Sequence, residues 1–110
     1  MKARERREER RVALSRRATI LNGATPVPCL LQDFSSRGFF MITNQKFFIG
    51  QILELSCELY PDQVLCCKIE VKHINETCIG TKIAEINAAG TALLQKFLQE
   101  YYSLKLNQST

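Results

Sequence analysis

Residues 33–40 read DFSSRGFF and separate two apolar runs of the chain. Serine and glycine are turn-forming residues, whereas the flanking phenylalanines are typical of strands. The stretch therefore predicts a strand–turn–strand unit, with Asp33 and Ser35 at the turn and outside the core. Its polar groups could simply close local backbone hydrogen bonds, and taken alone the stretch favours that ordinary structural role.

The same stretch also has the chemistry of a binding site. The Asp33 carboxylate can accept hydrogen bonds from paired N–H donors, such as those on a guanine edge. The hydroxyl and backbone amides around Ser35 can bind a phosphate, and Gly38 permits another group to approach the backbone closely. The choice between the two roles depends on what the rest of the chain offers.

Short apolar runs of the strand type extend in both directions from this unit. Turn signals such as Asn22-Gly23, Pro61-Asp62 and Asn75-Glu76 separate them. The predicted strands cover residues 17–22, 27–33, 38–43, 52–59, 63–73 and 77–86. Six short strands at this spacing predict a mainly β barrel or sandwich.

The spacing of apolar residues changes after Asn87, which is a good helix N-cap. Apolar side chains then recur at helical intervals, at Leu93, Leu94, Phe97, Leu98, Tyr101 and Leu104. One amphipathic helix is therefore expected to follow the strands. Its predicted role is to close an open end of the barrel, with partner binding as the alternative.

Composition limits the chain to one compact domain. It has 110 residues, 45% of them hydrophobic, which suffices for one core without disulfides or metal. The five cysteines show no CxxC spacing and are predicted to be small buried apolar residues. They are Cys29, Cys57, Cys66, Cys67 and Cys78. No metal or cofactor is expected.

Neither membrane insertion nor catalysis is predicted. No stretch approaches the ~18 apolar residues of a membrane span, and the N-terminus lacks the apolar centre of a signal peptide, so a cytoplasmic location is expected. The chain has one histidine, His73, in a predicted strand and with no candidate nucleophile nearby. Walker and dinucleotide-binding glycine patterns are also absent, so no catalytic residues are assigned.

The basic residues are concentrated at the N-terminus. Residues 1–17 carry eight basic and three acidic side chains, a net charge of +5, whereas the whole chain carries +4. We predict a flexible basic arm over residues 1–16, followed by a barrel with its helix over residues 17–110. Arg7 and Arg11 form an RxxxR pair within this arm. Guanidinium groups bind phosphate and guanine through forked hydrogen bonds and also stack on bases.

Together, Arg7-x-x-x-Arg11 and Asp33-x-Ser35-x-x-Gly38 resemble the motifs of the PilZ domain family, RxxxR and [D/N]xSxxG. The segment Ile79-Gly80-Thr81-Lys82-Ile83 also looks like the late-strand glycine segment of that family. The resemblance covers about residues 6–104. It implies a mainly β fold, a six-stranded antiparallel PilZ-type barrel with a C-terminal α-helix.

The resemblance further implies a receptor for cyclic di-GMP, a bacterial second messenger. Such a receptor changes conformation on binding and regulates a protein partner that controls motility, pili, exopolysaccharide or virulence. Arg7 and Arg11 would contact phosphates and guanine faces, Asp33 would hold a guanine edge, Ser35 would bind a phosphate or shape the turn, and Gly38 would leave space. Further candidates are Arg6, Arg10, Ser36, Arg37, Gly80 and Lys82. The sequence departs from the family at Arg37, where many members have glycine, and at Ala13, where proline is common.

Two other functional hypotheses remain alongside the cyclic di-GMP receptor. A small nucleic-acid-binding barrel could use the basic arm together with Phe34, Phe39 and Phe40. Because Phe39 and Phe40 must point to opposite faces of a strand, at least one of them is expected in the core. A ligand-free adaptor could instead bind a partner through the C-terminal helix or the patch Phe47-Phe48-Ile49.

Overall fold

The computed structural model describes the backbone of residues 12–109 and the side chains of residues 15–101. Its elements are β1 (Val12–Asn22), β2 (Thr25–Phe34), β3 (Gly38–Ile42), β4 (Ile52–Tyr60), β5 (Gln63–Asn75), β6 (Cys78–Glu85) and α1 (Ala88–Ser109). The strands form a closed antiparallel barrel in the order β1-β2-β3-β6-β5-β4. The predicted six-stranded barrel with a C-terminal helix is confirmed.

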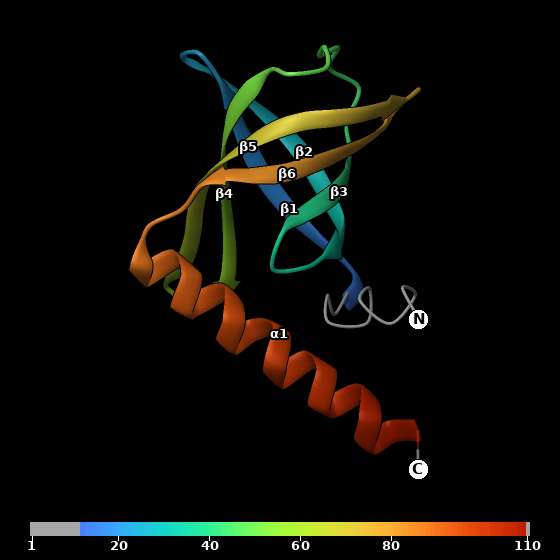
Figure 1. Cartoon of the computed structure of the whole chain (residues 1–110), viewed down its shortest axis with the longest axis vertical. Helices are drawn as coiled ribbons and strands as arrows, with labels where there is room; N and C mark the ends of the chain where they lie inside the picture. Colours follow the sequence, from blue (N-terminus) through green and yellow to red (C-terminus); the bar gives the residue numbers. More distant parts are fainter. Residues whose placement is uncertain (1–11, 110) are drawn as a thin grey trace, which may run out of the picture.

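One short pairing closes the barrel. β1 and β4 meet through three residue pairs, from Thr19 with Ser56 to Leu21 with Glu54. Neighbours in sequence form the hairpins β1-β2, β2-β3, β4-β5 and β5-β6, whereas β3 pairs with the more distant β6. The connection from β3 to β4 passes over one end of the barrel, while α1 lies at the other end (Figure 1). Both ends of the barrel interior are therefore covered.

Alternation of side chains along the strands fills the interior. In β5, Leu65, Cys67, Ile69 and Val71 are buried, whereas the residues between them point outward. This is the period of two expected for a strand with one buried face. Cys29, Cys57 and Cys67 belong to the core as predicted, but Cys66 and Cys78 are exposed, because they occupy outward positions of β5 and β6.

β1 begins five residues earlier than the sequence predicts. Val12 and Ala13 pair with Phe34 and Asp33 of β2, so residues 12–16, which were predicted to be part of the arm, extend a strand. Arg16 is thereby held near the helix, with its guanidinium 5.3 Å from the centre of the Phe97 ring. Residues 1–11 of the predicted arm lie outside the described part of the chain.

α1 packs against the end of the barrel through one apolar side. Asn87 caps the helix as predicted, because its Oδ1 accepts a 2.7 Å hydrogen bond from the Gly90 amide. Leu94, Phe97 and Leu98 are buried, and the Phe97 ring lies 5.5 Å from that of Phe34. Within residues 12–109, no helix is both long and apolar enough to cross a membrane.

The cysteines provide a direct test of the strand register. Burial raises the pKa of the Cys29 and Cys67 thiols to about 12 and that of Cys57 to about 11. Because the thiolate is the reactive form, we expect DTNB at pH 8 to modify Cys66 and Cys78 rapidly and the three buried thiols only on unfolding. The same reaction in guanidinium chloride is the control and should release five equivalents. Rapid reaction of all five in the native protein would contradict this register.

Candidate functional site

The turn between β2 and β3 is built around the buried hydroxyl of Ser35. This side chain is fully buried, and its Oγ accepts hydrogen bonds from the amides of Arg37 and Gly38, each 3.1 Å long. Oγ also donates to the Gly38 carbonyl at 3.1 Å, and the Ser35 amide donates to the same carbonyl at 3.0 Å. Ser35 lies at the turn as predicted and is not part of the hydrophobic core, but its side chain is buried. Its hydroxyl is committed to shaping the turn.

Gly38 is required by the neighbouring strand. A Cβ atom at this position would overlap the carbonyl oxygen of Thr81 and would lie 2.9 Å from the Cα of Lys82. The space predicted at Gly38 is thus filled by the backbone of β6. Since that obstacle is backbone, no rotamer change can relieve it, and the close approach of β3 and β6 depends on glycine.

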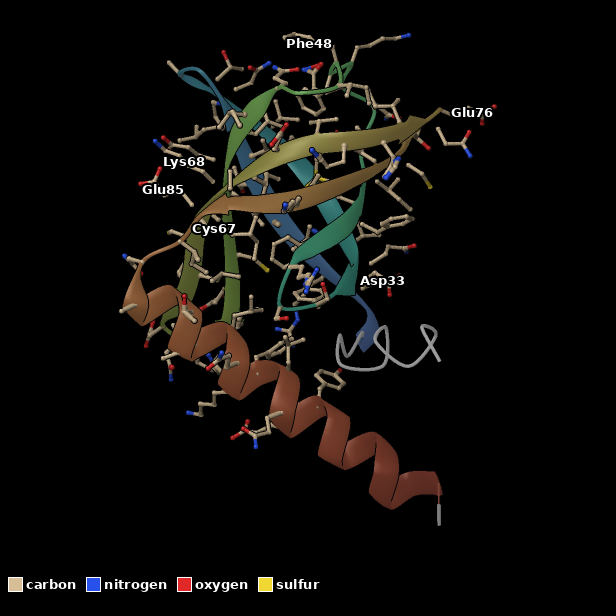
Figure 2. All side chains as sticks on the ribbon, in the orientation of Figure 1. Asp33, Phe48, Cys67, Lys68, Glu76 and Glu85 are labelled. Carbon is tan, nitrogen blue, oxygen red and sulfur yellow. The ribbon has the colours of Figure 1, made fainter. Side chains whose placement is uncertain are left out.

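Two β-bulges lie beside the turn and direct Asp33 outward. The register of β2 with β3 shifts between Leu31 and Asp33, and that of β1 with β2 shifts between Ala13 and Arg16. A bulge changes the direction of the side chains that follow it. Phe34 consequently points into the core, whereas Asp33 is only half-buried and lies on the outside of the barrel, toward the end that carries α1 (Figure 2).

Positive side chains of the described region flank Asp33 and the turn. Arg37 is exposed, although its backbone is fixed, because its amide donates to Ser35 and its carbonyl accepts a 2.7 Å hydrogen bond from the Ile83 amide. Lys82 is exposed and pairs with Gly38 across β3 and β6. These two cations can attract an anionic ligand to a surface that also offers the Asp33 carboxylate.

The structure brings together the predicted site residues of the barrel. Ser35, Ser36 and Arg37 form the turn between Asp33 at the end of β2 and Gly38 at the start of β3, and Gly80 and Lys82 lie on β6, which pairs with β3. The candidates Arg6, Arg7, Arg10 and Arg11 lie outside the described residues. The covalent chain nevertheless bonds Arg11 to Val12, whose strand partner is Phe34.

Phe40 lies beside this site but is not among the residues predicted for it. It pairs directly with Asp33 and is exposed by 43%, whereas its neighbour Phe39 is buried. The expectation that at least one of the two lies in the core is confirmed. The alternation of Gly38, Phe39 and Phe40 was the signal that could have assigned Phe40 to the outer face.

Other surfaces are separate from the turn. One open groove lies on the outer face of β1, β4 and β5, lined by Thr19, Glu54, Cys66 and Lys68, and it includes no residue of the 33–38 turn. Phe48 and Ile49 are exposed, and Phe48 lies at the opposite end of the barrel from Asp33 (Figure 2). Among the side chains of residues 15–101, no three acidic, histidine or cysteine groups gather as a metal site would require.

The sequence and the fold of the chain are both similar to those of known proteins. The family model of the PilZ domain matches residues 5–100. The fold resembles that of the Bacillus subtilis inhibitor of motility (MotI/DgrA), with a TM-score of 0.76 and 20% identity over 94% of this chain and 53% of that one. The chain thus spans about half the length of that protein.

A second similar structure is that of the PilZ domain of YcgR from Escherichia coli with c-di-GMP. Its TM-score is 0.74, at 10% identity over 94% of this chain and 97% of that one. At these identities the two structures establish a shared fold. No curated protein sequence matches the chain.

The hydrogen bonds of Ser35 predict a stability difference between two adjacent serines. Ser35→Ala leaves the amides of Arg37 and Gly38 without their buried acceptor, so we expect a loss of about 1–3 kcal/mol in the free energy of unfolding. The matched control is Ser36→Ala, because Ser36 is exposed, and it should change stability by less than about 0.5 kcal/mol. Equal stability of both variants in urea unfolding would refute a structural role for the Ser35 hydroxyl.

Proposed function

Because the chain belongs to the PilZ domain family, we propose that it is a non-catalytic receptor for cyclic di-GMP that regulates a protein partner. The observation that carries this proposal is the preformed turn, in which buried Ser35 fixes the backbone while Asp33, Arg37 and Lys82 remain available on the outer surface. This division of roles supports a binding site that needs little rearrangement on the barrel side.

Each group at the turn suits one part of the proposed ligand. A carboxylate such as Asp33 can accept two hydrogen bonds from the N–H groups on a guanine edge. Arg37 and Lys82 can neutralise phosphate charge. Adenine has no such pair of donors on its edge, so Asp33 favours guanine over adenine.

The arginines of the arm complete this proposal. Arg11 is bonded to the first residue of β1, and four extended residues reach at most about 14 Å, so Arg7 and Arg11 are both within range of a ligand at Asp33. Fork-shaped guanidinium groups can bind phosphate oxygens and also lie against guanine faces. Arg6 and Arg10 are the alternative pair if the register of the arm differs by one residue.

Isothermal titration calorimetry tests the ligand. We expect cyclic di-GMP to bind at one or two molecules per chain, and cyclic di-AMP and GTP to bind much more weakly. Asp33→Ala, Arg7→Ala and Arg11→Ala each remove a charge-assisted contact worth about 1.5–3 kcal/mol, and should weaken binding roughly ten- to hundredfold.

The control variants also remove one acidic or one basic side chain, but at exposed positions outside the turn. Glu54→Ala and Arg17→Ala alter exposed residues that do not belong to the turn, and should bind as the wild type does. Wild-type affinity in all three test variants, or equal affinity for the three nucleotides, would rule out this site.

We further propose that the arm changes conformation when the ligand binds. Residues 1–11 carry many like charges and almost no apolar surface, so a ligand with two phosphates would both reduce their repulsion and join them to the barrel. Hydrogen exchange should therefore show protection of residues 4–11 that rises with cyclic di-GMP and falls again at high salt. The amides of β4 serve as the internal control. Equal protection of the arm with and without nucleotide would exclude this change.

A partner would bind the surface that forms when the ligand joins the arm to the barrel. Residues 1–11 lead directly into β1, and β1 places Arg16 against Phe97 of α1. The adjoining surfaces of the arm and helix are therefore the proposed contact region. Motility, pili, exopolysaccharide and virulence remain the candidate processes.

A further inference from the structure

An aromatic side chain lies beside Asp33 on the outer face of the barrel. Phe40 of β3 pairs directly with Asp33 of β2 on one side and with Gly80 of β6 on the other. Directly opposed residues of antiparallel strands have Cβ atoms about 4.5–5.5 Å apart. The carboxylate and the ring are therefore immediate neighbours on the same face.

Gly80 provides the space in which the Phe40 ring rests. A Cβ atom at Gly80 would lie 3.1 Å from Cε1 of Phe40 and 3.4 Å from Cβ and Cδ2 of His73. The ring thus lies over the bare backbone of β6, with His73 of β5 on the other side of the glycine. Despite this support, Phe40 keeps 43% of its surface exposed, whereas Phe39 keeps 1%.

We infer that Phe40 is the surface on which the guanine held by Asp33 stacks, an assignment that rests on the proposed function. Because Asp33 is the strand partner of Phe40, a base lying over this ring can direct its edge toward the carboxylate on β2. Stacking on an aromatic side chain is tolerant of base identity, whereas hydrogen bonds to the edge distinguish guanine from adenine. Phe40 therefore supplies affinity, and Asp33 supplies specificity.

The structural alternative is that Phe40 only shields Gly80, as aromatic residues do for glycines in sheets. That role needs an apolar side chain of similar size, and leucine can supply it. Base stacking needs a flat π surface, which leucine lacks. Phe40→Leu therefore separates the two roles.

The test uses the absence of tryptophan from the chain. Phe40→Trp introduces a single tryptophan at the proposed stacking position, and Phe48→Trp introduces one at an exposed position on the opposite end of the barrel (Figure 2). Both variants are titrated with cyclic di-GMP, and the affinities of the wild type and of Phe40→Leu are measured by calorimetry. Urea unfolding verifies that each variant remains folded.

We expect cyclic di-GMP to quench Phe40→Trp but not Phe48→Trp. Phe40→Leu should bind roughly five- to hundredfold more weakly than the wild type while unfolding at nearly the same urea concentration. Wild-type affinity in Phe40→Leu, or no quenching of a Phe40→Trp variant that binds, would overturn this inference and leave the proposed function intact. Failure of the wild type to bind cyclic di-GMP would overturn both.

Discussion

The buried hydroxyl of Ser35 is the constraint on which the candidate site depends. Three hydrogen bonds at 3.1 Å use this one group to hold the amides of Arg37 and Gly38 and the Gly38 carbonyl. The turn therefore keeps its shape without help from a ligand. Gly38 then enters β3 so close to Thr81 that no side chain fits, which fixes the position of the turn relative to β6.

Within a few positions of the chain, this arrangement turns some side chains into the core and leaves others exposed to a ligand. Phe34 points inward, where it packs against Phe39 and Phe97 at centroid distances of 5.6 and 5.5 Å. Asp33, one residue earlier, lies on the outer surface. The proposed binding surface consequently adjoins the aromatic cluster that joins the barrel to α1. Arg16 adds a second connection, because it lies over Phe97 and donates 3.4 Å hydrogen bonds to the carbonyls of Glu58 and Leu59.

Much of this fold could be predicted from the sequence because its patterns are local. Turn residues mark the ends of the hairpins, and Asn87 followed by a helical apolar spacing marks α1. The start of β1 was missed because Val12 and Ala13 owe their strand conformation to pairing with β2 across a bulge, which is a tertiary contact. Cys66 and Cys78 were placed wrongly because a strand assignment does not by itself determine which face is inside.

The grouping of the candidate-site residues at one turn was predictable from the sequence, but the structural roles of these residues were less so. Motif spacing identified Asp33, Ser35 and Gly38, but left open whether Ser35 binds a phosphate or shapes the turn, and assigned the space at Gly38 to a ligand. Whether a serine hydroxyl bonds to a ligand or to its own turn depends on its burial, and whether glycine makes room for a ligand or for a strand depends on the neighbour. The neighbour at Gly38 is set by the pairing of β3 with β6, which local sequence does not encode.

The most direct test of the central claim is a titration of the ¹⁵N-labelled protein with cyclic di-GMP, followed by amide chemical shifts in two-dimensional NMR spectra. If the turn between β2 and β3 is the binding surface, the largest changes should fall on residues 33–40 and 80–82. The amide shifts of Thr19, Glu54 and Lys68, which line the groove on the outer face of β1, β4 and β5, should remain unchanged. Changes centred on that groove or on Phe48 and Ile49, or no changes at all, would contradict this account.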